Sequence, residues 1–390
     1  MAGCHHRFWA GKAIVMNKNY AVFIDDDDLM LKAIRRTAKR LFPDWQVSLI
    51  EAPKEWQAKI DTAPSPDIVF CDYRMPQITG AEILKSVAKN YPLAIRVLVT
   101  GDTSDEAIVT CNQVAHTLLA KPFTDEQLIE FLEHVATLKA LNLSTDERRL
   151  ICQSSQIPVL PDVVTRLREA LANDQSDLPH LADIVSKEPI IAARLLQMAN
   201  SAYLGYHRAT DSLEEAIARI GTQLLHAMTM SFSIEKATEH LLTANAHQQI
   251  CQYTEQYAQV TRRVFMRLSN NKAQTERAFI CAVLSGIGRL VMAALAESDR
   301  SAYDEFCNTH KQPAMLISAF LLTLWCYPDN LHEELLQVQA SPVNPDISIA
   351  QTLLLTQQYL CHRDDNEAME EWLSTLPAVY AEAFSAEGEK

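Results

Sequence analysis

Paired cysteines and basic clusters are missing from this 390-residue sequence. Its nine cysteines are scattered and never spaced C-x-x-C, which argues against a disulfide framework or a zinc knuckle and fits a reducing compartment. Lys and Arg number 35 against 49 Asp and Glu, and the net charge of −14 disfavours binding to nucleic acid or to an anionic membrane surface. We therefore expect a cytoplasmic protein with no nucleic-acid or membrane partner.

Long uncharged apolar runs and glycine-rich loops are also scarce. The two most apolar windows are residues 278–296, which contain Arg289, and residues 314–327, which are shorter than the ~20 residues of a membrane span. Both windows predict buried helices. Among the nine glycines, Gly286-x-Gly288 lacks the third glycine and the preceding strand of a nucleotide-binding loop, and no G-x-S-x-G occurs. Nucleotide-binding enzymes and serine hydrolases are therefore disfavoured.

Residues 20–140 alternate short apolar runs with helical periods, a pattern typical of a parallel sheet with crossover helices. Unbroken runs such as Val22-Phe23-Ile24 predict central strands that are covered on both faces. Residues 1–19 lack a signal-peptide pattern, and we expect a disordered extension there. The five predicted strands are Ala21–Ile24, Gln46–Ile50, Asp67–Cys71, Ile95–Val99 and His116–Leu119.

The strand pattern disappears after residues 141–149, which we expect to form a linker. Residues 150–390 show successive helical periods, and they predict an all-α unit with extra helices at its C-terminal end. Capping boxes at Thr124–Gln127 and Ser212–Glu215 predict two helix starts, and Pro189 suits the first turn of a helix that runs to Asn200. The last ten residues are polar and acidic, and we expect them to fray.

Charged and hydroxyl side chains follow four of the predicted strands. Asp25-Asp26-Asp27-Asp28 ends the first, Asp72 the third and Thr100 the fourth, and the fifth leads to Lys121. Carboxyl ends of parallel strands meet at one edge of a sheet, where ligands bind in this class of fold. Carboxylates crowded there repel one another, and a hard divalent cation with oxygen ligands removes that cost. The sequence therefore predicts a Mg²⁺ site.

A carboxylate in such a site can attack a phosphoryl donor, because the cation and a lysine neutralise the phosphoryl oxygens. We assign Asp72 as the nucleophile that forms an acyl phosphate. Thr100 is expected to donate its hydroxyl to one phosphoryl oxygen. Lys121 is expected to bind another, and to pair with Asp72 when no phosphoryl group is present.

Residues 20–140 resemble the receiver domain of two-component response regulators. Asp72–Gly80 carries the family's phosphoacceptor signature, D-x-x-M-P-x-x-x-G. The resemblance implies a flavodoxin-like doubly wound fold, a histidine kinase as partner, and Asp25 and Asp26 as the acidic pair. It further implies that Asp26 ligates Mg²⁺ directly, that Asp25 acts through water, and that the backbone carbonyl of Arg74 joins Asp72 in the ligand set. Leu118 departs from the family, which often has Tyr or Phe three residues before the lysine.

Residues 150–345 resemble the HDOD domain, a helical relative of the HD phosphohydrolases. The resemblance is carried by Ile157–Pro161, Lys187-Glu188-Pro189, Ala199–Tyr203, and Ala216-Ile217 ahead of Gly221. HD hydrolases bind metals through histidines and a His-Asp pair within a helix. The corresponding positions here are Ser285-Gly286, Tyr253, Ala314 and Gln339-Ala340, none of which is a histidine. The twelve histidines of the sequence include no H-x-x-x-H pair. The resemblance thus implies a catalytically inactive helical output domain.

These features predict a two-component response regulator, a phosphoprotein whose helical domain signals by protein–protein contact. One alternative is an HD-type phosphodiesterase that hydrolyses a cyclic dinucleotide, and a related one is a non-catalytic regulator of a cyclic-di-GMP enzyme. A transcription factor needs a basic recognition surface, and Arg262-Arg263 with Arg267 is too small a cluster for that role.

Overall fold

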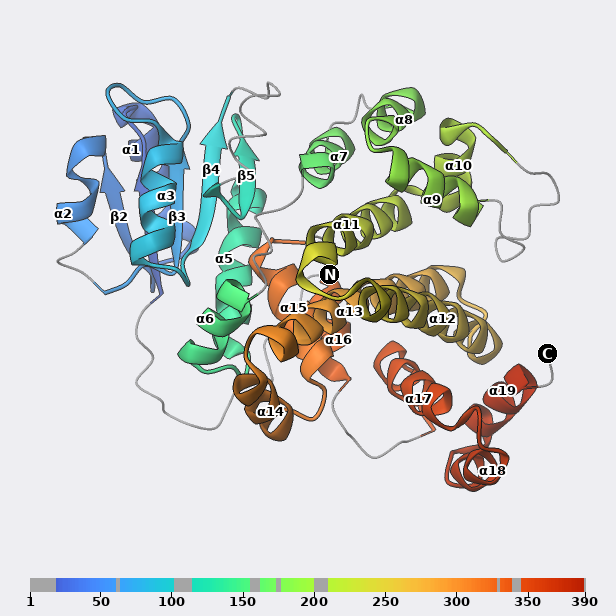
Figure 1. The fold of residues 1–390 in the computed structure, drawn as a ribbon. Helices are drawn as coiled ribbons and strands as arrows, with labels where there is room; N and C mark the ends of the chain where they lie inside the picture. Colours follow the sequence, from blue (N-terminus) through green and yellow to red (C-terminus); the bar gives the residue numbers. More distant parts are fainter. Residues whose placement is uncertain are drawn as a thin grey trace, which may run out of the picture.

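The computed structural model describes residues 19–60, 64–101, 114–154, 162–172, 177–199, 210–327, 330–338 and 345–388. An α/β unit is followed along the chain by a larger helical unit, and α5 lies between the sheet and the helices (Figure 1). Several predicted features fall outside the described residues. They are the extension up to residue 18 and the segments 157–161, 200–203 and 339–340.

The five strands of the α/β unit form one parallel sheet in the order β2-β1-β3-β4-β5. This confirms the predicted five-stranded sheet, and each strand end lies within one residue of its predicted position. The strands are β1 (Tyr20–Ile24), β2 (Gln46–Ile50), β3 (Ile68–Asp72), β4 (Ile95–Thr100) and β5 (Thr117–Ala120).

Helices cover both faces of the sheet, because alternate strand residues point to opposite sides. Phe23 and Phe70 stack with ring centroids 4.5 Å apart and belong to the core on the side of α1 and α5. Val22 and Ile24 belong to a second core with the side chains of α2 and α3. The described helices of this unit are α1 (Asp28–Leu41), η1 (Pro53–Glu55), α2 (Trp56–Ile60), α3 (Gly80–Asn90) and α5 (Asp125–Ala140).

The helical unit is built around α13, which packs against α11, α12 and α15 (Figure 1). Its helices up to α13 are α6 (Thr145–Ser154), α7 (Asp162–Ala172), α8 (Leu178–Ser186), α9 (Pro189–Ala199), α10 (Leu213–Ile220), α11 (Thr222–Thr238), η3 (Glu239–Leu241), α12 (Ala244–Leu268) and α13 (Lys272–Ser298). The remaining helices are α14 (Arg300–Thr309), α15 (Pro313–Leu324), α16 (Leu331–Gln337), α17 (Ile349–His362), α18 (Asn366–Ser374) and α19 (Ala378–Gly388).

The two apolar windows are buried helices, as predicted. Within the described residues, α13 alone is long and apolar enough to cross a bilayer, and 83% of its most apolar window is buried inside the protein. Gly288 explains part of that burial: a β-carbon there would lie 1.8 Å from the carbonyl oxygen of Ala314. The absence of a side chain thus allows α13 and α15 to approach closely.

Two local expectations are wrong. Residues 145–149 are not linker but the first turns of α6, because Ser144 and Glu147 exchange capping hydrogen bonds through their side chains and backbone N–H groups. The C-terminal residues up to 388 do not fray but form α19. Phe384 is buried there, and Glu387 accepts hydrogen bonds from Arg263 and Arg267 of α12.

The predicted capping boxes hold to different extents. At Thr124 and Gln127 both reciprocal hydrogen bonds are present. At Ser212 the side chain caps the N–H of Glu215, but the carboxylate of Glu215 accepts from Thr210 and Arg219 instead of closing the box.

The two units share a buried interface. Helix α5 packs against α15, and one continuous apolar cluster contains residues of both, including Phe131 and Leu324. Arg168 of α7 donates to the hydroxyl of Thr117 in β5 and, at 3.0 Å, to the carbonyl oxygen of Trp325. The helical unit therefore contacts the sheet directly at β5.

Candidate functional site

Four predicted site residues lie at the carboxyl ends of neighbouring strands. Asp25 follows β1, Asp72 ends β3, Thr100 ends β4, and Lys121 follows β5. Asp25, Asp72 and Thr100 are 5%, 8% and 2% exposed, so the hydroxyl and the two carboxylates belong to the buried rim of the sheet. The strand order brings together residues that are up to 96 positions apart in the sequence.

Lys121 joins the two buried carboxylates. Its Nζ lies 2.5 Å from Oδ1 of Asp72 and 2.7 Å from Oδ2 of Asp25. The other carboxylate oxygens accept backbone N–H groups two residues ahead, from Asp27 to Asp25 and from Arg74 to Asp72, each at 2.9 Å. The expected Lys121–Asp72 pair is thus present, and both aspartates are held in fixed orientations.

The loops around these residues follow from local sequence. Asp27 is the N-cap of α1 and accepts from the N–H groups of Leu29 and Met30, so it serves the helix. Gly80, the last residue of the D-x-x-M-P-x-x-x-G signature, begins α3 beside β3, and a β-carbon there would lie 2.1 Å from the backbone oxygen of Asp72. A glycine at this position is therefore required for the close approach of α3 to the backbone of Asp72.

Burial raises the pKa of Asp72, the bond from Lys121 offsets part of this rise, and the nearby Asp25 adds to it. For Lys121, burial opposes the charged form, but the hydrogen bonds with Asp25 and Asp72 outweigh it and raise the pKa of the ammonium. The ammonium is therefore a charged partner shared by both buried carboxylates.

The donor set fits Mg²⁺. Asp25, Asp26 and Asp72 carry three negative charges against one positive charge on Lys121, and the remaining excess matches a divalent cation. Among the residues that the structure describes, no three His, Cys, Asp or Glu side chains converge into a complete metal cage. Mg²⁺ commonly takes only one or two carboxylates and retains several waters, so this incomplete set suits it.

Asp26, Arg74 and Leu118 were also singled out in the sequence, and the structure places each of them outside the Lys121 contacts. Asp26 is exposed between the buried Asp25 and the N-cap Asp27. The N–H of Arg74 is committed to Asp72, which fixes the adjoining loop, and its carbonyl role stays a prediction. Leu118 is 8% exposed and packs in the core on the α3 side of the sheet.

The resemblance relates Ser285, Gly286 and Tyr253 to the HD metal site, and each of them contacts neighbouring residues. The hydroxyl of Ser285 donates to the carbonyl oxygen of Ala282, and a β-carbon at Gly286 would lie 2.6 Å from the methyl group of Thr254. The ring of Tyr253 lies 4.6 Å from the guanidinium of Arg289. These side chains therefore contribute to helix packing around α13.

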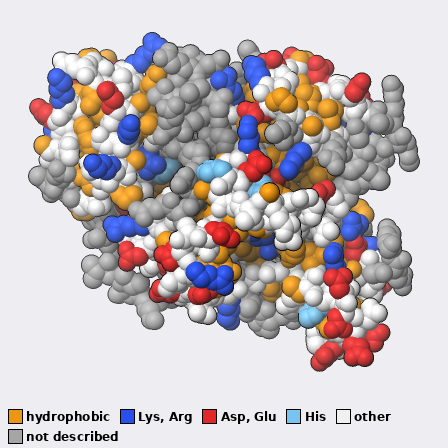
Figure 2. Space-filling model, viewed as in Figure 1, with side chains coloured by type: hydrophobic (Ala, Val, Ile, Leu, Met, Phe, Trp, Pro, Cys, Tyr) orange, Lys and Arg blue, Asp and Glu red, His pale blue; other side chains and the backbone are white. Residues whose placement is uncertain are grey.

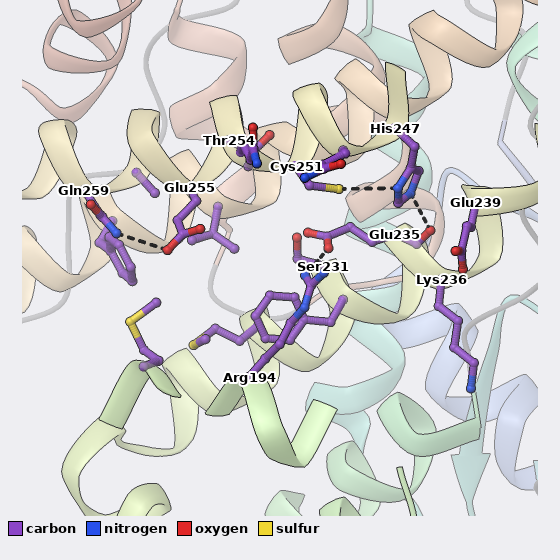
Figure 3. A pocket seen from close by; sticks show the side chains of 18 of the residues that line it. Arg194, Ser231, Glu235, Lys236, Glu239, His247, Cys251, Thr254, Glu255 and Gln259 are labelled. Carbon is purple, nitrogen blue, oxygen red and sulfur yellow. Dashed lines mark hydrogen bonds and ion pairs between the residues drawn. The ribbon is translucent and has the colours of Figure 1, made fainter. Parts of the chain in front are cut away.

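A cavity of about 630 Å³ between α9, α11, α12 and α13 is a feature that sequence reasoning missed (Figure 3). In its wall, Nε2 of His247 bonds the carbonyl oxygen of Glu235 at 2.8 Å, and Nδ1 lies 3.8 Å from the sulfur of Cys251. Burial and the nearby Glu235 raise the pKa of Cys251 to about 12, so the thiol stays protonated and is no nucleophile. In the sequence, the only sign of the His247–Cys251 contact is the i,i+4 spacing of these two residues.

Comparisons with known proteins assign both units. The response regulator receiver domain family matches residues 21–133, and the HDOD domain family matches residues 157–339. The chain is 30% identical over 156 residues to the hydrogenase transcriptional regulatory protein HoxA of Cupriavidus necator. The matched region covers 39% of this chain and 30% of HoxA. The chain is also 25% identical over 115 residues to the chemotaxis protein CheY1 of Helicobacter pylori, across 29% of this chain and 92% of CheY1.

A solved structure of a putative metal-dependent phosphohydrolase from Shewanella amazonensis covers 67% of this chain and 96% of its own, with 16% identity and a TM-score of 0.44. This chain spans less than a third of the length of HoxA, so the activity of that whole protein does not transfer to it.

Proposed function

We propose that this chain, which joins a response regulator receiver domain to an HDOD domain, is a cytoplasmic regulator that accepts a phosphoryl group on Asp72 from a histidine kinase, with Mg²⁺ as the cofactor. The observation that carries the proposal is the shared contact of Lys121 with both Asp25 and Asp72 at the strand ends. This arrangement supplies a nucleophile, a fixed cation beside it and an oxygen-rich metal site in one place.

The residues have distinct tasks in this mechanism. Oδ1 of Asp72 attacks the phosphorus of the donor in line, a P–O bond forms, and the P–N bond to the donor imidazole breaks. Lys121 leaves Oδ1 and neutralises a phosphoryl oxygen, and Thr100 donates its hydroxyl to another. Bound Mg²⁺ supplies charge neutralisation for the phosphoryl oxygens.

The HDOD domain acts in this proposal as a non-catalytic output module. The packing at Gly286 supports it, because a β-carbon there would already lie 2.6 Å from the methyl group of Thr254, so the side chain of an aspartate would collide with that residue. The alternatives are an HD-type phosphodiesterase for a cyclic dinucleotide and a protein partner that regulates such an enzyme. On the face shown in Figure 2, basic side chains are scattered among acidic ones, which fits a protein partner better than DNA.

Transmission to the output module would run through β5. Lys121 follows one end of this four-residue strand, and Thr117 at the other end is bound by Arg168 of the HDOD domain. A phosphoryl group that draws Lys121 away from Asp72 would also change the strand that Arg168 holds.

The test is phosphorylation by acetyl phosphate with Mg²⁺, followed by intact-mass measurement. Wild type should gain one phosphoryl group that is labile to hydroxylamine, and Asp72→Asn should gain none. Asp44→Asn, which removes an exposed carboxylate elsewhere in the receiver domain, is the matched control and should label normally. Labelling retained in Asp72→Asn would move the acceptor elsewhere.

A separate measurement addresses the phosphodiesterase. Stoichiometric iron or manganese in the purified full chain, together with hydrolysis of cyclic di-GMP, would contradict the non-catalytic role. Neither should be found.

A further inference from the structure

A cavity of the HDOD domain, lined by residues of α9, α11, η3, α12 and α13, lies away from the phosphoacceptor site and has no task in the proposed function. Its volume of about 630 Å³ is within the range of small-molecule sites, about 300–1,000 Å³. The described side chains that line it belong to α9, α11, η3, α12 and α13. It is therefore a concavity between packed helices.

The described lining of the cavity contains both apolar and acidic side chains. Met198 of α9, Met228 and Phe232 of α11, and Phe279 and Val283 of α13 supply its apolar wall. The carboxylates of Glu235, Glu239 and Glu255 come from α11, η3 and α12. In Figure 3, Glu235 and Glu255 lie on facing sides of the opening, with Arg194 reaching in from α9.

The two cations of the wall already have partners. Arg194 pairs with Glu235 and lies 4.8 Å from the ring of Phe232, and Lys236 binds Glu188, which lies outside the cavity lining, at 3.1 Å. Glu235 is 7% exposed, so its charge is poorly solvated. Among the described lining residues, three carboxylates face two cations, one of which is engaged by a fourth carboxylate, so this part of the wall carries a net negative charge.

We propose that this cavity binds a small organic cation, an amine with an apolar body. The ammonium would lie on the side of the exposed carboxylates Glu239 and Glu255, because Glu235 is already held by Arg194, and the apolar body would lie against Met198 and Met228. An anion such as a nucleotide would meet unfavourable carboxylates and cations that are already paired. The site is separate from Asp72, so the proposal stands or falls independently of the phosphoryl chemistry.

The test uses three probes with one apolar body: 4-phenylbutylammonium, the neutral 4-phenylbutanol and the anionic 4-phenylbutanoate. Binding to the full chain labelled with ¹³C-methyl methionine is followed by NMR. The resonances of Met198 and Met228 should shift, while that of Met266, 60% exposed and outside the cavity, should not. The amine should bind about tenfold or more tightly than the alcohol, with the carboxylate weakest, and added salt should reduce the difference.

Charge variants at the rim test the acidic side without disturbing the buried Arg194–Glu235 pair. Glu239→Gln and Glu255→Gln, both exposed positions, should each weaken amine binding about two- to fivefold and leave alcohol binding unchanged. Glu305→Gln, an exposed position of α14, is the matched control and should change neither. Equal or tighter binding of the carboxylate, no shift of Met198 and Met228, or an unchanged amine affinity in the double rim variant would each overturn the proposal.

Discussion

Mild acid should weaken the interface between the receiver and HDOD domains, because two uncharged histidines face each other across it. His134 of α5 and His332 of α16 are 4% and 3% exposed, with ring centroids 5.8 Å apart. Burial is the main reason that the pKa of each ring is lowered to about 4. The nearby His332 and Arg168 also lower the pKa of His134, and Arg277 also lowers that of His332. Protonation of either ring would place a charge beside other cations in a desolvated interface.

The direction and size of the effect of pH on the interface follow from proton linkage. The pKa is lower in the closed protein than the value of 6.5 in water, so the open state binds more protons below pH 6.5. The stabilising contribution is therefore complete above pH 6.5 and is lost as the pH falls toward 4. Between pH 7 and pH 5.5 each histidine accounts for a loss of about 1 kcal/mol. Together they shift the open-to-closed ratio roughly 30-fold.

The assay is hydrogen exchange of α5 and α16, corrected for intrinsic rates, together with urea unfolding at several pH values. Wild type should lose protection in both helices as the pH falls from 7 to 5.5. A His134→Phe/His332→Phe variant keeps two rings in the interface but cannot be protonated, so it should lose about 2 kcal/mol less over the same range. His116 and His226 are also buried and continue to titrate in that variant, so its slope is reduced and not abolished.

His180→Gln removes an exposed histidine of α8 and should leave the wild-type slope unchanged. If the double variant showed the same dependence on pH as wild type, the assignment of these two rings as the buried neutral pair would be refuted.

Three further changes probe other contacts. Gly80→Ala should lower stability by about 1–3 kcal/mol and impair labelling of Asp72, because the added methyl group meets the Asp72 backbone. Thermal unfolding measures the loss of stability. The control is Gly101→Ala, which should be near neutral because the nearest atom to the added methyl group would lie 4.0 Å away. Arg168→Leu should raise hydrogen exchange in β5 by removing the bonds to Thr117 and Trp325, and unchanged exchange would exclude a coupling role. A Ser285→His/Gly286→Asp variant should be destabilised and bind no stoichiometric metal by elemental analysis, since Thr254 occupies the space.

The sheet and the residues at its rim could be predicted because their signals are local. Runs such as Val97-Leu98-Val99 are apolar without interruption only where both faces are covered, and they place β4 and therefore Thr100. The D-x-x-M-P-x-x-x-G spacing likewise fixes a turn in which Gly80 must pass the Asp72 backbone. Among the four consecutive aspartates, the resemblance named Asp25 and Asp26, and the structure pairs Asp25 with Lys121 and commits Asp27 to capping α1.

The cavity and the interdomain contacts could not be predicted, because they depend on residues that are distant in sequence. Arg168 and Thr117 are 51 residues apart, and Arg194 and Glu235 are 41 apart. The acidic C-terminal segment was expected to fray because its polarity suggested solvation. The structure instead gives Glu387 two arginine partners on α12, which lie more than 100 positions away.

The interface also limits how the phosphoryl signal can act. A shift of a two-state equilibrium from 1:99 to 99:1 needs about 5.5 kcal/mol. The hydrogen bond between Arg168 and the neutral hydroxyl of Thr117 contributes on the order of 1–3 kcal/mol, so its loss alone would give only a partial shift. A complete release would have to involve α5 as well, where the apolar contact with α15 and the His134–His332 pair lie. Phosphorylation and mild acid should therefore act on the same interface, and acidification should increase the fraction that phosphorylation opens.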